Sequence, residues 1–79
     1  MRILDDESDQ SLNRVTLYLT SAEARELVDS ISSLLTNNGV HHEHVPSTDF
    51  QKELTVTVYD SQSIESFDER SKRLIIHDT

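Results

Sequence analysis

Cysteine is absent from this chain, and glycine and proline occur once each. Without cysteine, a disulfide framework and a metal centre built on thiolates are both excluded, which fits a reducing compartment. A single glycine excludes the glycine-rich loop that cradles phosphate in nucleotide-binding proteins. The sequence therefore lacks the commonest supports of a small secreted domain and of a nucleotide site.

Long hydrophobic runs are also missing. None approaches the roughly 18 apolar residues that span a bilayer, and residues 1–10 lack the apolar core of a signal peptide. We therefore expect a cytoplasmic protein. Hydrophobic residues make up 34% of the chain, aromatic residues make up 5%, and tryptophan is absent. A core this small is either a marginal but sufficient monomer or is completed by a second copy, and we favour a homodimer.

Basic residues are scarce, so the net charge is −8. Residues 1–11 and residues 40–62 each contribute −3 of it. Because phosphate backbones would be repelled, we expect no nucleic-acid partner. The charge favours a protein partner with a basic surface, while solubility alone explains it equally well.

The clearest structural signal is a helix over residues 21–36. Thr20 and Glu23 match a capping box, in which two side chains satisfy backbone donors at a helix start. Asn37-Asn38-Gly39 offers a stop, since glycine adopts the left-handed C-cap conformation. One face of this helix is apolar. That face is formed by Ala24, Leu27, Val28, Ile31, Leu34 and Leu35.

Three alternating runs, residues 14–19, 40–45 and 53–59, predict strands. Ser66 and Glu69 match a second capping box, so we predict a helix over residues 64–75, although Leu74-Ile75-Ile76 also suits a strand. The predicted class is α+β, a β-α-β-β-α sandwich with helices on one face of a three-stranded, mostly antiparallel sheet. Residues 12–79 form this single domain, and residues 1–11 form an acidic flexible tail.

This arrangement predicts a core and an opposite sheet face. The predicted core packs Leu27, Ile31 and Leu34 of the helix on Val15, Leu17, Val56 and Val58 of the sheet. The opposite face presents threonine and tyrosine, a composition that suits either a partner contact or an ordinary solvated sheet. Its residues are Thr16, Tyr18, Thr55, Thr57 and Tyr59.

The histidine cluster at residues 41–44 is the densest group of ligand-type side chains. His42 and His44 point to the same side of a strand and are weak candidates for a metal, with Glu53 or His77 as the third ligand. The spacing matches no recognised zinc motif, so we expect no metal site and no cofactor. No nucleophile motif occurs either, and we expect no enzyme.

Several runs resemble short bacterial proteins of the type that provides immunity in polymorphic toxin systems. These runs are VTLYLTSAEARELVDSISSLL, HHEHV, KELTVTVYD and FDERSKRLI. The resemblance implies a cytoplasmic, acidic protein that binds a toxin domain and blocks it. A homodimeric structural or regulatory domain and a histidine-based metal binder are the alternatives. The expected partner-binding residues are Tyr18, Glu43, Asp49, Glu53, Tyr59 and Asp60.

Overall fold

A computed structural model describes residues 1–36, 42–60 and 64–79 of the chain. Its elements are β1 (Leu4–Asp5), β2 (Gln10–Ser11), α1 (Ser21–Thr36), β3 (His42–Pro46), β4 (Glu53–Thr57) and α2 (Glu69–His77). Two compact units contain them: residues 18–59 form one, and residues 1–17 together with residues 60–79 form the other. Over the described residues, this confirms the α+β class.

Helix α1 begins where its cap predicts. The Glu23 backbone N–H donates to Thr20 Oγ1 at 3.1 Å, and the Thr20 backbone N–H donates to Glu23 Oε1 at 2.8 Å. Both halves of the capping box are therefore formed. The predicted span of residues 21–36 is confirmed. The predicted stop at residues 37–39 and the start of the predicted strand at residues 40–41 lie outside the described residues.

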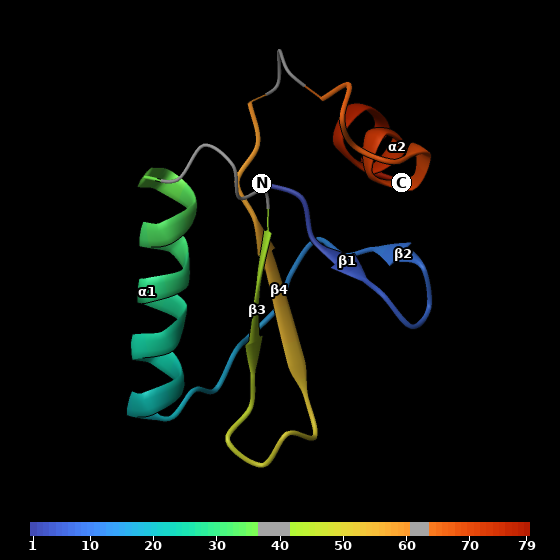
Figure 1. Ribbon diagram of the computed structural model, residues 1–79. Helices are drawn as coiled ribbons and strands as arrows, with labels where there is room; N and C mark the ends of the chain where they lie inside the picture. Colours follow the sequence, from blue (N-terminus) through green and yellow to red (C-terminus); the bar gives the residue numbers. More distant parts are fainter. Residues whose placement is uncertain (37–41, 61–63) are drawn as a thin grey trace. The chain divides into compact units, whose positions relative to one another are not determined.

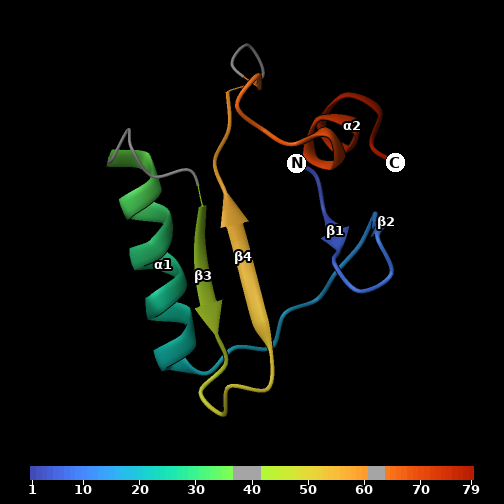
Figure 2. The same cartoon turned by 45° about the vertical axis from the view of Figure 1, so that its right-hand side comes forward.

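Strands β3 and β4 form an antiparallel hairpin, and α1 lies beside it (Figures 1 and 2). Glu43 pairs with Val56 and Val45 pairs with Leu54, so these side chains share the face that α1 covers. Leu34 of α1 and Val45 of β3 are the buried hydrophobic residues of this unit, at 7% and 4% exposure, among the residues described. The hairpin and its covering helix confirm the local fold predicted for residues 42–57.

The predicted three-stranded sheet is wrong. Residues 14–19 belong to no strand, and both sheets that the structure describes have two strands, ordered β1-β2 and β3-β4. A strand needs a neighbour to accept its backbone hydrogen bonds, and alternation supplies only a face. Thr20 alone separates Leu19 from α1, whereas a turn from strand to helix usually takes two to six residues. Val15 and Leu17 of the predicted core are accordingly exposed.

The C-terminal segment is a helix and not a strand. Helix α2 spans Glu69–His77, so the prediction of a helix over residues 64–75 is confirmed in type but begins too early. Asp68 is the N-cap in place of Ser66, and its carboxylate accepts from the Ser71 backbone N–H at 2.7 Å. A carboxylate also interacts favourably with the positive end of the helix dipole. This contact lowers the pKa of Asp68 below its usual value.

Residues 1–11, expected as a flexible tail, contain the β1-β2 hairpin. Leu4 pairs with Ser11 and Asp5 pairs with Gln10. Arg2 donates through Nε to the Leu74 carbonyl at 3.1 Å and through Nη2 to the Ile75 carbonyl at 3.1 Å, near the end of α2. The sequence missed this hairpin, because its stabilising contacts join residues more than seventy positions apart.

Asp9 is the acidic counterpart of this arrangement. Its side chain accepts from Arg70 Nε and lies 3.7 Å from Arg73 Nη2. Part of the negative charge of residues 1–11 therefore offsets the basic residues of α2 within the same unit. The cluster at residues 70–73, which we expected to complement the helix dipole, also binds an acidic side chain.

Candidate functional site

The hairpin turn, residues 47–52, is the most tightly hydrogen-bonded loop of its unit. The Ser47 backbone N–H donates to the Lys52 carbonyl at 2.8 Å, and the Phe50 N–H donates to the Ser47 carbonyl at 2.9 Å. Asp49 Oδ1 accepts from Ser47 Oγ at 2.6 Å and from the Gln51 N–H at 3.0 Å. These contacts lower the pKa of Asp49, the Ser47 hydroxyl contributing most. The turn therefore has a defined shape.

Glu23 fixes this turn to the start of α1. Its Oε2 accepts from the Thr48 backbone N–H at 2.8 Å, while Oε1 completes the capping box. At 8% exposure, Glu23 is the buried charged residue of the described chain. The Thr20 and Thr48 N–H groups stabilise the carboxylate and lower the pKa of Glu23. One side chain thus joins the helix cap to the hairpin turn.

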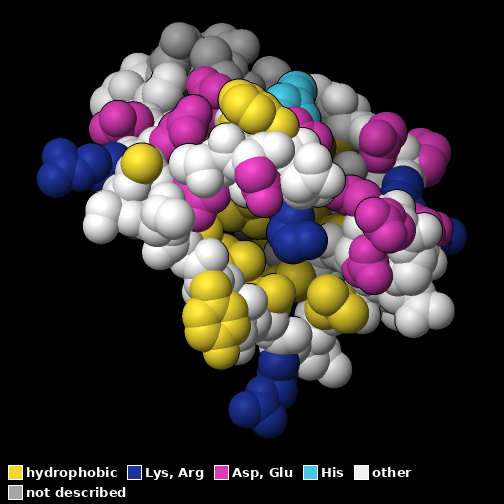
Figure 3. All heavy atoms as spheres, turned by 90° about the horizontal axis from the view of Figure 1, so that it is seen from below, with side chains coloured by type: hydrophobic (Ala, Val, Ile, Leu, Met, Phe, Trp, Pro, Cys, Tyr) yellow, Lys and Arg dark blue, Asp and Glu magenta, His cyan; other side chains and the backbone are white. Residues whose placement is uncertain are grey.

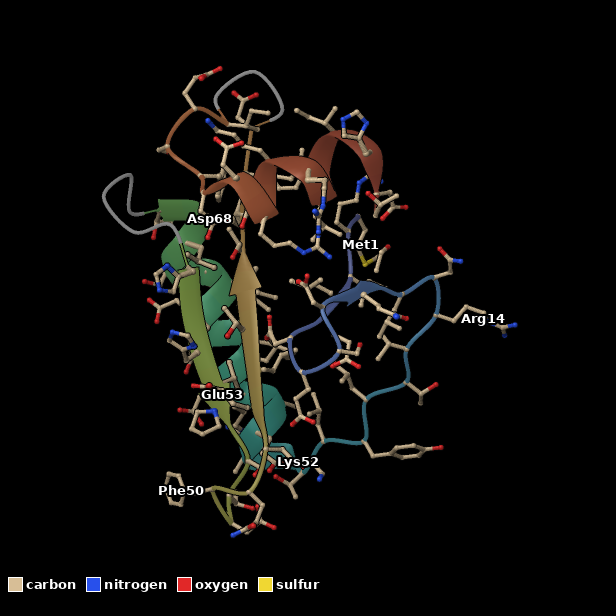
Figure 4. All side chains as sticks on the ribbon, turned by 90° about the vertical axis from the view of Figure 1, so that its right-hand side faces the viewer. Met1, Arg14, Phe50, Lys52, Glu53 and Asp68 are labelled. Carbon is tan, nitrogen blue, oxygen red and sulfur yellow. The ribbon has the colours of Figure 1, made fainter. Side chains whose placement is uncertain are left out.

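Phe50 occupies this turn against two local preferences. Its φ is 58°, in the left-handed region, where a bulky side chain costs about 1–3 kcal/mol relative to glycine. Its side chain is also 80% exposed, and Figure 4 shows the ring pointing away from the hairpin. An aromatic ring is therefore displayed to solvent at the end of a fixed turn.

The face of the hairpin opposite α1 carries polar and imidazole groups. We call this face, formed by His42, His44, Glu53, Thr55 and Thr57, the outer face. His44 Nδ1 lies 2.9 Å from Thr55 Oγ1 and 3.2 Å from Glu53 Oε1. The His42 and His44 rings are 5.1 Å apart in an edge-to-face arrangement. Glu53 thus brings an acidic group to the outer face within one or two turns of Phe50 along the chain.

The expected partner-binding residues do not form one patch in the described structure. Tyr18 is 92% exposed but lies in no strand, and Tyr59 lies beyond the end of β4. Glu43 is half-buried on the side of α1, and the Asp49 carboxylate is engaged within the turn. Glu53 stands exposed on the outer face, and Asp60 belongs to the other unit. Glu53 is therefore the expected residue that lies best beside Phe50.

The histidine pair has the predicted orientation. His42 and His44 share a side of β3, and Glu53 approaches His44 as expected of a third ligand. Across the parts of the chain that are described, however, no three His, Asp or Glu side chains are grouped to hold a metal ion. His77, the other candidate ligand, lies in α2 of the second unit. Metal binding at these residues stays a prediction.

Sequence reasoning missed Phe50 and the second role of Glu23. A phenylalanine in a turn rich in Ser, Thr and Asp is a weak signal, because its backbone conformation is not encoded in composition. The contact between Glu23 and Thr48 joins residues 25 positions apart and has no local signature. Only the position of Glu23 in the capping box marked it in advance.

Comparison with protein-family models, curated proteins and solved structures finds no match to this chain. Neither α1 nor α2, within the described residues, has both the length and the apolar character of a helix that crosses a bilayer. Hydrophobic side chains do reach the surface beside acidic ones (Figure 3). The argument for function therefore depends on the hairpin turn and the outer face.

Proposed function

We propose that the protein is a non-enzymatic, cytoplasmic binding module that recognises the basic surface of another protein. The resemblance noted in the sequence makes an immunity-type inhibitor of a toxin the specific form of this proposal. Phe50 is the observation that carries it. Its exposure and its left-handed backbone both oppose folding, and residues that break local rules in this way mark functional positions.

The fixed turn supports an anchoring role for Phe50. Aromatic side chains dominate the binding energy of many interfaces, especially when they enter a pocket of the partner. Ordering a loop on binding costs free energy, and the contacts of Asp49 and Glu23 hold this loop before any partner arrives. An aromatic ring on a preformed turn therefore favours tight association.

The acidic charge supports a basic partner. With a net charge of −8 and Glu53 exposed on the outer face, the protein attracts cationic surfaces over a distance of about 10 Å at moderate salt. Such attraction raises the rate of association more than it slows dissociation. An inhibitor that blocks a cationic active-site surface requires this combination of steering charge and apolar anchor.

Replacement of Phe50 by glycine separates folding from binding. Phe50→Gly removes the backbone strain and the exposed ring, so we expect the same or a higher melting temperature. It should also weaken partner binding by about tenfold or more. Quantitative mass spectrometry of proteins retained by the parent and by the variant from the producing cell identifies the partner, and purified components then give the affinity.

Ile76→Ala is the control for this comparison, because Ile76 is also exposed, at 57%, but lies in α2. It should retain every protein that the parent retains. A basic partner that binds Phe50→Gly and the parent equally would contradict the role of Phe50. A marked fall in the stability of the glycine variant would contradict the strain argument.

Charge reversal tests the electrostatic part of the proposal. Glu53→Lys should slow association with the isolated partner by several-fold to about tenfold at low salt, and the difference should shrink as salt screens it. Asp6→Lys makes the same change of charge in the β1-β2 hairpin and should bind nearly as the parent does. Stopped-flow association rates at several ionic strengths provide the measurement. Equal rates for the two variants would leave the charge with solubility alone.

A further inference from the structure

Helix α1 has a second apolar row that the two-stranded hairpin leaves open. Val28, Ile31 and Leu35 are spaced by three and four residues, so they lie along one line of the helix surface. Their exposures are 62%, 38% and 68%. We call this row the α1 stripe. A helix that packs on a sheet buries such a row when the sheet is wide enough, and β3 with β4 is too narrow.

The nearer strand of the hairpin also has an unpaired edge. Helix α1 lies mainly against β3 and less against β4. Within the described residues, β4 is the strand neighbour of β3, so the other edge of β3 carries backbone groups with no strand beside them. An added strand at this edge would widen the sheet on the side nearer α1. Edges of this kind are ready templates for another strand.

The chain itself contains a segment with the properties of the missing strand. Residues 14–19 alternate apolar and polar side chains but pair with no strand that the structure describes. Their apolar members, Val15, Leu17 and Leu19, are exposed at 55%, 49% and 40%. Burial of the apolar side of this segment against the α1 stripe would remove both sets of side chains from water.

The connection to α1 favours docking between copies over docking within one chain. Thr20 alone separates the segment from the helix, and its backbone and hydroxyl are held in the helix cap. A connection this short restrains the segment from folding back beneath its own helix. Short, strained hinges favour the exchange of a segment between identical chains.

Charge also favours this contact between two acidic molecules. Residues 10–22 contain one basic residue, Arg14, and no acidic residue, in a chain of net charge −8. Glu26 and Asp29 lie on exposed positions of α1. The segment is therefore the part of the chain that approaches a second copy with the least repulsion, and Arg14 complements the acidic helix.

From these observations we propose that two copies exchange residues 14–19, each segment pairing with the free edge of β3 and covering the α1 stripe of the other copy. Each half then has a three-stranded sheet beneath α1. Phe50 and the outer face take no part in the exchange, so the dimer and the partner-binding proposal are independent. The closing experiment uses this chain alone and therefore does not depend on any partner.

Sedimentation equilibrium of the full chain over a wide range of concentration tests the exchange. We expect the parent to dimerise and Leu17→Asp to weaken dimerisation by about tenfold or more, because the charge would be buried against the stripe. Tyr18→Asp is the matched control: it makes the same charge change one residue later, on the opposite side of the segment, and should dimerise like the parent. Circular dichroism checks that each variant keeps α1.

A mixture of two variants tests reciprocity. Leu17→Asp disables the donated segment, and Val28→Asp disables the accepting stripe. Each alone should be mainly monomeric, whereas their mixture regains one working contact per heterodimer and should associate more strongly than either variant alone. A parent that stays monomeric, equal effects at positions 17 and 18, or a mixture no stronger than its components would overturn the exchange.

Discussion

Leu34→Ala is expected to unfold the unit formed by residues 18–59. Leu34 is 7% exposed on α1, which packs on β3, and truncation of a buried leucine costs about 2–5 kcal/mol. A chain of 79 residues without disulfides has only about 3–5 kcal/mol of net stability. The cost is therefore comparable with the whole free energy of unfolding. Urea unfolding followed by circular dichroism should show little or no folded baseline.

Leu35→Ala is the control for this substitution, since it removes the same atoms one residue later. Leu35 is 68% exposed, so in dilute protein, where contacts between copies are fewest, the free energy of unfolding should change by about 0.5 kcal/mol or less. A Leu34→Ala variant that unfolds at the same urea concentration as Leu35→Ala would mean that α1 does not pack on β3 through this side chain.

Replacement of Glu23 by alanine is the second large effect that we expect. It removes the acceptor of the Thr20 and Thr48 N–H groups, so the helix cap and the hairpin turn are weakened together. Helix caps contribute measurably to stability, and in a domain of this size the melting temperature should fall by on the order of 10 °C. Glu26→Ala removes an exposed carboxylate of the same helix and should have a much smaller effect.

The same carboxylate predicts a direction for acid sensitivity. The folded protein holds the pKa of Glu23 below its unfolded value, so the folded state binds the proton less strongly. Its contribution to stability is complete above the ordinary pKa of glutamate, about 4.3, and is lost as pH falls below that value. Glu23→Gln should flatten the fall in melting temperature across this acidic range, whereas Glu26→Gln should leave it as steep as in the parent.

Helix α1 and the β3-β4 hairpin were predictable because their signals are local and agree with one another. The capping box and the apolar period specify the same helix, and alternation on both sides of Pro46 specifies the hairpin. Residues 14–19 were mispredicted for a different reason. Alternation indicates that a segment suits a strand, but pairing depends on whether a neighbouring edge lies within reach.

The remaining errors have physical causes of the same kind. Ser66 and Asp68 both suit an N-cap, and local pattern cannot rank them. The contacts of Arg2 and Asp9 with α2 depend on long separations in sequence, which composition does not reveal. The display of Phe50 depends on one backbone torsion. The candidate site was thus anticipated at Glu53 but missed at its aromatic residue.

The division of the chain between two units has a consequence for the order in which they form. Residues 18–59 are continuous, so their contacts close short loops and can form while the C-terminal segment is still being synthesised. The other unit joins residues 1–17 to residues 60–79 and must wait for the end of the chain. Ribosome-bound chains that stop near residue 60 should therefore protect α1 and β4 from a protease while leaving Arg2 and Asp9 without α2.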